Sequence, residues 1–249
     1  MATQRHLRNA PIREALIDIR CETPKSPIDL VVAYANKIAV SGSQVNDIWD
    51  GEVTFKLDAA EGEPNSLHSA TRVGKRVDLP IGKHRDVVQL KARELTFSRL
   101  AGYENWESMA TPAFECWSGF ARSVPMARVD QIAVRYINAI QLPLPIVDFR
   151  EYLVAPPDIP DGLPQMLRGY MSRVSFGQDD MLANVTQVLE GLTPDGSEAS
   201  VLLDIEVASP CSMDPLDVGG IREIADRLRN FKNEVFFRYL TEKTLGRYE

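Results

Sequence analysis

An asparagine on an otherwise apolar strand face is the polar residue best placed to contact a ligand. Strict alternation predicts a strand with one face made by Ile132, Val134, Tyr136, Asn138 and Ile140. A buried amide needs hydrogen-bond partners, so one hypothesis places Asn138 in a crevice between two halves of the protein, facing a ligand. The alternative is that Asn138 satisfies backbone groups at a strand bend beside Pro143. Arg135 points to the opposite face, where it could pair with carboxylates of neighbouring strands.

Four carboxylates at alternate strand positions form a second candidate site: Glu14 and Asp18 early in the chain, Asp204 and Glu206 late. Such sets can bind a divalent cation. With Arg20 or Arg135 nearby they would resemble the phosphate-processing metal site of triphosphate tunnel enzymes. The chain lacks the Glu-x-Glu-x-Lys run of those enzymes, since Leu16 lies between Glu14 and Asp18. The alternative is a solvated sheet face, and we expect no metal and no cofactor.

The segment from Arg72 to Arg93 is locally basic within an acidic protein. Its phosphate or nucleic-acid contacts would come from Arg72, Lys75, Arg76, Arg85 and Lys91. No aromatic residue is interleaved there to stack on bases. The alternative is a charged hairpin that keeps an edge strand from aggregating.

Composition and missing motifs narrow the function classes. The 249 residues carry 28 basic and 35 acidic side chains, a net charge of −7, which argues against a general nucleic-acid or anionic-membrane binder. No nucleophile elbow, phosphate-binding lysine loop, zinc-protease helix or dinucleotide-binding glycine fingerprint occurs. Three widely spaced cysteines, Cys21, Cys116 and Cys211, indicate reduced thiols. With neither a secretory signal nor a long apolar run, we expect a cytoplasmic protein.

The first half is predicted to position these residues on strands backed by a long helix. A half-buried strand is expected at Arg13–Cys21 and a short helix from Ile28 to before Gly42, with a weaker strand at Glu52–Leu57. Residues 59 to 83 are expected to hold at most one strand, near Ser69–Val73. Two further strands, Val87–Leu90 and Leu95–Leu100, precede an apolar helical stripe from Trp106 to Val124, which Pro112 should kink or interrupt.

The second half repeats this order of elements. After the strand around Asn138, a short helix is expected at Val147–Leu153, then strands at Met166–Phe176, Leu182–Leu189 and Ser200–Val207. The clearest helix begins near Asp217, with Arg222, Glu223, Arg227 and Lys232 on its outer side.

Corresponding elements of the two halves keep an offset of about 115 residues, which suggests an internal duplication. The expected fold is α+β: a curved antiparallel sheet from two similar halves, 1–125 and 126–249, with two long helices packed on one face. This order resembles the TATA-binding-protein type of fold. The alternative is two small α+β layers that are similar only in length.

Short motifs along the whole chain resemble a sporadically distributed prokaryotic family of about this length that has no established activity. They are Asn9-Ala10-Pro11-Ile12-Arg13-Glu14-Ala15, Tyr103 with Trp106, Arg135-Tyr136-Ile137-Asn138, Leu203-Asp204-Ile205, Lys232-Asn233, Phe236-Phe237 and Leu240-Thr241. The resemblance implies one full-length unit and a patchy distribution, of the kind seen for genes in mobile or defence-linked cassettes.

Together these features favour a non-enzymatic binding or adaptor module with a protein partner, and they leave room for a homo-oligomer. One alternative is a metal-dependent phosphoryl or nucleotide enzyme that uses the sheet-face carboxylates. Another is a nucleic-acid-binding accessory protein that uses the basic segment.

Overall fold

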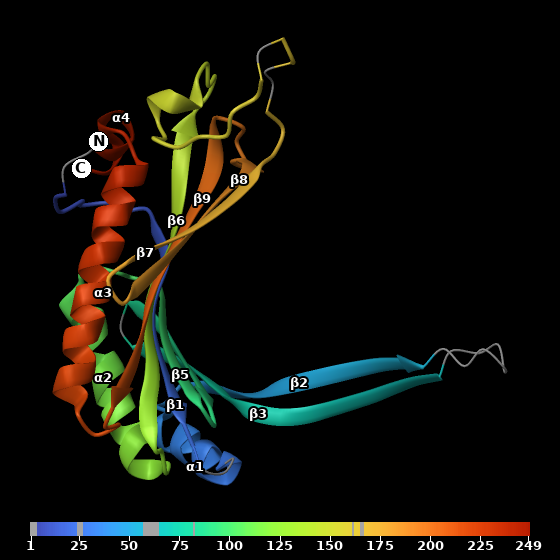
Figure 1. The fold of residues 1–249 in the computed structure, drawn as a ribbon, viewed down its shortest axis with the longest axis vertical. Helices are drawn as coiled ribbons and strands as arrows, with labels where there is room; N and C mark the ends of the chain where they lie inside the picture. Colours follow the sequence, from blue (N-terminus) through green and yellow to red (C-terminus); the bar gives the residue numbers. More distant parts are fainter. Residues whose placement is uncertain (1–3, 24–26, 57–64, 82, 161, 165–166) are drawn as a thin grey trace.

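A computed structural model describes residues 4–23, 27–56, 65–81, 83–160, 162–164 and 167–249, and it has an α+β fold. Nine antiparallel strands form one sheet in the order β2-β3-β4-β5-β1-β6-β9-β8-β7 (Figure 1). The strands are β1 (Ile12–Glu22), β2 (Gln44–Lys56), β3 (Asn65–Ile81), β4 (His84–Lys91), β5 (Glu94–Ala101), β6 (Arg128–Pro143), β7 (Met171–Gln178), β8 (Met181–Leu192) and β9 (Glu198–Met213). The helices are α1 (Ile28–Ile38), α2 (Trp106–Ser123), α3 (Val218–Tyr239) and α4 (Glu242–Leu245), with single 3₁₀ turns at Phe149–Glu151 and Gly246–Tyr248.

Strands β1 and β6 form the centre of the sheet. Their register pairs Ala15 with Tyr136 and Ile17 with Val134, so the apolar faces predicted for the two strands coincide. Ile17, Ile132, Val134, Tyr136 and Ile140 are all buried. The alternation predicted for both strands is therefore confirmed, because each has one face in the core and one face outside it.

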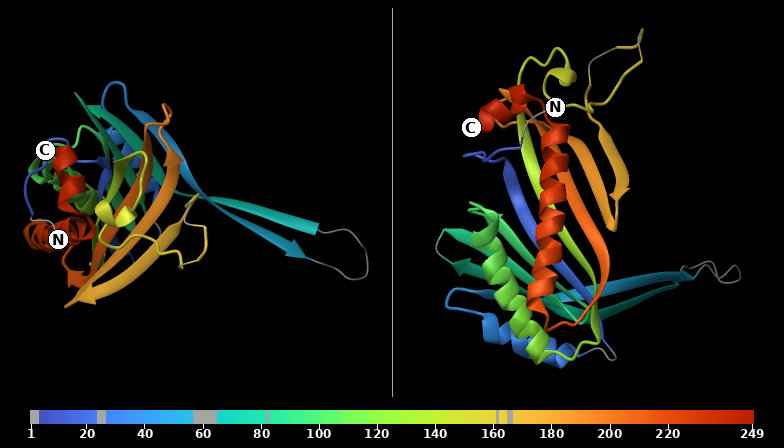
Figure 2. Two further views of the ribbon diagram at one scale, coloured as in Figure 1. Left: turned by 90° about the horizontal axis from the view of Figure 1, so that it is seen from above. Right: turned by 60° about the vertical axis from the view of Figure 1, so that its left-hand side comes forward.

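The long helices lie side by side along the same side of the sheet in both views (Figures 1 and 2). α3 contacts β6 and β9, whereas α2 contacts β5, α1 and α3. Asn105 and Asp217 begin these helices: each side chain accepts a hydrogen bond from the backbone N–H three residues later. Pro112 does not interrupt α2. It removes only the hydrogen bond to the Ser108 carbonyl, while Trp117 and Phe120 stay buried against the sheet.

The largest difference from the sequence-based expectation is a projecting arm made by β2 and β3 (Figure 1). A weak strand and at most one short strand were expected in this region, but β3 runs continuously from Asn65 to Ile81 and pairs with β2 from Gln44↔Asp78 to Lys56↔Asn65. Thr71 and Arg72 on β3 and Asp47 and Trp49 on β2 are not buried. Val77 and Leu79, where β3 pairs with β4, are buried. Further out, at positions that do not enter the core, the sequence needs no apolar alternation, which explains why the pattern missed the length of these strands.

The second half also departs from the prediction at two places. Instead of a helix over Val147–Leu153, a single 3₁₀ turn spans Phe149–Glu151, begun by the Asp148 side chain. The expected strand Met166–Phe176 begins at Met171, and the first residue of that prediction, 166, lies outside the described residues. β8 and β9 extend beyond the predicted ends, since their outer residues pair with each other as far as Leu192↔Ala199.

We expect Gly119→Ala to loosen the contact between α1 and α2. A Cβ at Gly119 would lie 2.4 Å from the Tyr34 hydroxyl, which donates a 2.7 Å hydrogen bond to the Cys116 carbonyl. Overpacking of this kind lowers the free energy of unfolding by about 1–3 kcal/mol, which outweighs the higher helix propensity of alanine. Urea denaturation would measure the change. Gly219→Ala is the matched control, because its Cβ would meet only Asp217, at 3.8 Å; equal effects of the two substitutions would contradict the steric explanation.

Candidate functional site

A cavity of about 570 Å³ lies between α3 and the central strands, and we call it the helix-face cavity. Its walls come from the N-terminal segment 4–7, the start of β1, the β5–α2 connection Tyr103–Trp106, strand β6 and the C-terminal part of α3. Segments more than 100 residues apart in the chain therefore share one site.

Two tyrosines form the floor of the helix-face cavity. The hydroxyl oxygens of Tyr103 and Tyr136 are 2.9 Å apart, and their rings meet edge to face with centroids separated by 5.4 Å. Burial raises the pKa of both hydroxyls, that of Tyr136 well above its usual value. The indole of Trp106 closes one side and donates a hydrogen bond to the Asp226 carboxylate. These hydroxyls are therefore neutral hydrogen-bonding groups at neutral pH.

Lys232 reaches this cavity from α3 and is only 5% exposed. Its ammonium lies 3.6 Å from the ring centroid of Tyr136, a cation–π contact. Within the described part of the chain the ammonium has no hydrogen bond and no carboxylate partner. Burial, together with the nearby Arg229 guanidinium, lowers the pKa of Lys232 to about 7.

The placement of Lys232 corrects the sequence-based expectation, which put it on the outer side of the helix. Ile221, Ala225 and Leu228 are all buried, and Lys232 continues their spacing of three and four residues. The helical period thus contains the signal, whereas the residue type alone favours a solvent-exposed lysine. A lysine in register with a buried stripe was the detectable sign of this site.

Arg229 adds a second positive charge, which has no carboxylate partner among the residues that the structure describes. It lines the helix-face cavity one turn before Lys232, and its hydrogen bond goes to the Asn230 side chain, at 3.2 Å. The other charged residues of the cavity wall have partners: Arg5 pairs with Glu242 and Glu249, and Glu104 with Lys83. The cavity is therefore electropositive at Arg229 and Lys232.

Asn138 satisfies backbone groups, as one of its two interpretations expects, but within the β6–β9 pairing and not at a bend beside Pro143. Its amide nitrogen donates to the Leu203 carbonyl at 3.0 Å and to the Tyr136 carbonyl at 3.3 Å, so the side chain does satisfy backbone groups. It also lines the helix-face cavity and is 2% exposed. Its side-chain nitrogen is therefore held by the strands, and contact with a ligand stays a prediction.

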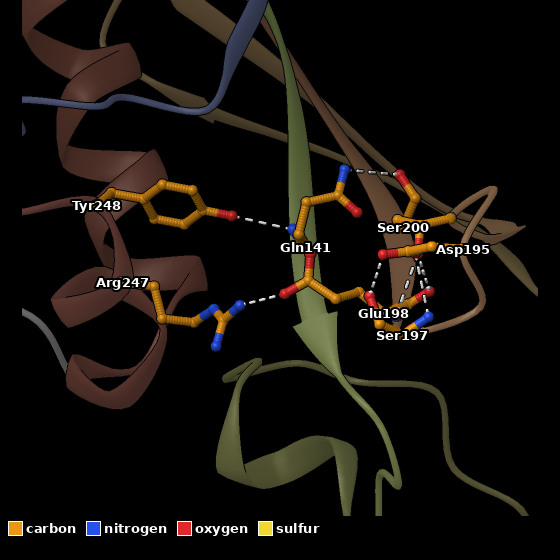
Figure 3. Close-up of polar contacts among 8 residues, drawn as sticks. Gln141, Asp195, Ser197, Glu198, Ser200, Arg247 and Tyr248 are labelled. Atoms are coloured by element: carbon orange, nitrogen blue, oxygen red, sulfur yellow. Dashed lines mark hydrogen bonds and ion pairs between the residues drawn. The ribbon is translucent and has the colours of Figure 1, made fainter.

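The C-terminal residues hold the N-terminal wall of the cavity in place. The Gln141 backbone N–H donates to the Tyr248 hydroxyl at 2.9 Å, and Arg247 pairs with Glu198, which lies beside the Asp195–Ser197 turn (Figure 3). On the other side, the Asn9 N–H donates to the Tyr248 carbonyl at 3.0 Å. Both chain ends are thereby tied to β6 next to the cavity.

The candidate carboxylates lie on the open face of the sheet, opposite the helix-face cavity. Arg135 makes a two-bond ion pair with Asp204, at 2.8 and 2.5 Å. This hydrogen bonding to Asp204 raises the pKa of Arg135, and the charges of Glu206 and Glu14 contribute. The predicted pairing of Arg135 with carboxylates is confirmed, and a guanidinium already occupies the position between the acids.

Asp18 lies in a different group of polar side chains from Asp204 and Arg135. It accepts hydrogen bonds from Thr96 at 2.7 Å and from Arg20 at 3.1 Å, while Glu94 pairs with Lys91. Burial raises the pKa of Asp18 to about 6. β6 separates β1 from β9, which places their backbones about 10 Å apart. Among the described residues no group of three His, Cys, Asp or Glu side chains could hold a metal ion, so the four acids are not brought together.

The basic segment is mostly neutralised by its neighbours. Lys75 lies 2.8 Å and Arg72 3.8 Å from Asp47, Arg76 pairs with Asp78, and Lys91 pairs with Glu94. Of the five residues suggested for phosphate contacts, only Arg85 has no ion pair within the described residues. Pairing across and along strands thus reduces the charge available to a polyanion.

The three cysteines are free thiols, as predicted. Burial raises the pKa of Cys21 to about 12 and that of Cys116 to about 11, which leaves both as thiols at neutral pH. They are therefore poor nucleophiles.

No protein-family model matches the chain, and no match was found among curated proteins or solved structures. No helix in the described residues has the length and apolar character needed to cross a membrane.

Proposed function

We propose that this protein is a ligand-binding module whose site is the helix-face cavity and whose ligand is a small organic anion with an aromatic body. The single observation that carries the proposal is the pair of positive side chains, Arg229 and Lys232, that line the cavity without a carboxylate partner among the described residues. A buried ammonium without a counter-ion is costly. A bound anion would supply the missing partner and recover that cost.

The walls of the cavity favour a ligand with an aromatic part. Trp106, Tyr103, Tyr136 and Phe236 provide ring surfaces, and the volume of about 570 Å³ is of the size that small-molecule sites typically have. The Asn138 amide and the paired tyrosine hydroxyls supply the few polar contacts that fix the orientation of a ligand.

The motifs behind the family resemblance support the same site. Ten of their residues line the helix-face cavity: Ala10, Ile12, Tyr103, Trp106, Tyr136, Asn138, Lys232, Asn233, Phe236 and Phe237. They come from four separate parts of the chain, so chance proximity along the sequence does not explain their meeting. If the chain belongs to that family, this cavity is the feature its members would share.

We further propose that the fold arose by duplication of a half resembling those of the TATA-binding-protein type. The strand order supports this: outward from the β1–β6 pair, β5, β4, β3 and β2 follow on one side and β9, β8 and β7 on the other. Each half ends in a long helix, α2 or α3, directly after the strand beside the central pair. In this interpretation the helix-face cavity lies between the halves, as the crevice hypothesis for Asn138 requires.

Calorimetric titration with 4-methylbenzoate tests the binding proposal. We expect saturable binding with a thermal stabilisation that grows with ligand concentration, and about tenfold weaker binding by Arg229→Gln, because a charge-assisted hydrogen bond is lost. Binding should weaken as the pH rises above 7, since free Lys232 then loses its proton.

Arg227→Gln is the matched control for this titration. Arg227 is on the same helix but pairs with Asp180 and does not line the cavity. Unchanged affinity in this variant is expected. Equal weakening by Arg227→Gln and Arg229→Gln would contradict the proposed function. So would a failure of both 4-methylbenzoate and 4-methylphenyl phosphate to bind saturably.

A further inference from the structure

We propose that Lys232 captures a carbonyl ligand as a reversible imine, so that the ligand class is an aldehyde or ketone that also carries an acid group. This inference rests on the proposed function and makes it more specific. Arg229 would hold the acid group, and the Lys232 nitrogen would bond to the carbonyl carbon in the helix-face cavity.

The position of the Lys232 nitrogen suits this chemistry. It lies 3.6 Å from the Tyr136 ring centroid and 6.0 Å from that of Phe236, so the side chain is held between aromatic groups at the cavity wall. No carboxylate of the described residues binds the nitrogen and blocks its approach to a ligand.

The protonation state of Lys232 supports the same reaction. Burial and the Arg229 charge bring its pKa down to about 7 from 10.5. At pH 8 most of the side chain is then the neutral amine, which is the nucleophilic form.

The step balances without an oxidant or reductant. The lone pair of the neutral amine attacks the carbonyl carbon, a C–N bond forms, and the carbonyl oxygen takes up a proton. The resulting carbinolamine loses its oxygen as water, which carries away both amine hydrogens, and the C=N bond remains. Tyr103 and Tyr136 have neutral hydroxyls, one of which donates to the other, and the accepting hydroxyl keeps its own hydrogen to donate to that oxygen. Hydrolysis reverses the reaction.

Lys243 offers an internal comparison. It also lies near an aromatic ring, 4.5 Å from the centroid of Tyr152, but it is exposed and forms an ion pair with Glu151. Hydrogen bonding to Glu151 raises its pKa. Each lysine lies near its own aromatic ring, but only Lys232 is buried and only Lys243 has a carboxylate partner. Comparing their reactivities therefore isolates the effect of the cavity.

The test treats the intact protein with 4-formylbenzoate and cyanoborohydride at pH 8, and peptide mass mapping locates the reduced adduct. We expect Lys232 to be modified about tenfold faster than Lys243, or more, because a larger fraction of it is neutral. Excess 4-methylbenzoate, which has no carbonyl, should slow the modification of Lys232 and leave Lys243 unaffected. Arg229→Gln should also slow it, and Lys232→Arg should abolish the adduct at position 232.

The outcomes separate this inference from the proposed function. If 4-methylbenzoate binds but Lys232 is modified no faster than Lys243, imine formation is wrong and anion binding stands. If neither 4-methylbenzoate nor 4-formylbenzoate binds, the proposed function is wrong, and so is imine formation, which depends on it. Rapid modification of Lys232 that 4-methylbenzoate and Arg229→Gln leave unchanged would overturn the acid-bearing ligand class.

Discussion

Asp86→Asn is expected to lower the free energy of unfolding by about 3–5 kcal/mol, because it leaves a buried arginine without its counter-charge. Arg99 donates to Asp86 through Nε at 2.7 Å and through Nη2 at 2.8 Å, and each side chain is 2–3% exposed. A third hydrogen bond, 3.2 Å long, joins Arg99 to Ser108 in the first turns of α2. The ion pair and this hydrogen bond thus connect β4 and β5 to α2, whose first residue, Trp106, lines the helix-face cavity.

Urea denaturation of three variants would check this expectation. The double replacement Asp86→Leu with Arg99→Met should cost much less than Asp86→Asn, since it removes both charges together. Glu107→Gln breaks the exposed pair with Arg222 and should change stability little. A loss from Asp86→Asn no larger than that from Glu107→Gln would contradict the importance of burial.

Lys232→Met is expected to stabilise the ligand-free protein at pH 6 and to lose that advantage at pH 10. The pKa of Lys232 is about 7 in the folded protein and near 10.5 ordinarily. Between these values the unfolded chain holds a proton that the folded protein has released, so the free energy of unfolding of the natural protein rises with pH. Below pH 7 both states are protonated and the cost of burying the ammonium, on the order of 4 kcal/mol, is present in full.

Denaturant unfolding of both proteins from pH 6 to pH 10 measures this difference. Methionine fills nearly the same volume without a charge, so the variant should be the more stable one at pH 6 and about equal at pH 10. Lys243→Met, which removes an exposed and paired lysine, should show no such convergence. A pH-independent difference for Lys232→Met would show that the ammonium is not destabilised by burial.

Local patterns were sufficient for the central strands and the main helices. Alternation over Ile132–Ile140 correctly separated Asn138 from Arg135, because neighbouring positions along a strand face opposite sides of a sheet. The helix begun by Asp217 was also predictable, since a helix cap depends on residues close in the chain.

The candidate site was less predictable than the fold. Glu14, Asp204, Glu206 and Arg135 do share the open face, but the intervening β6 and the Arg135–Asp204 ion pair separate the acids that a metal would need. The sequence placed Tyr136 on the apolar face of its strand, put Lys232 on the outer side of its helix, and gave Tyr103 only as part of a short motif. Nothing local to any of them indicates that they meet, because their proximity follows from the pairing of β1 with β6 and from the packing of α3 on β6.

By itself, the sequence determined which residues alternate or recur along each element, that the class is α+β, and that the cysteines have no disulfide framework. Only the tertiary structure decided which faces are covered, that the polar β2–β3 ribbon projects as an arm, and that Lys232 is buried over Tyr136. The reason is physical. The periods of helices and strands follow from backbone geometry over a few residues, whereas the environment of a charge depends on every segment packed around it, including segments more than 100 residues away.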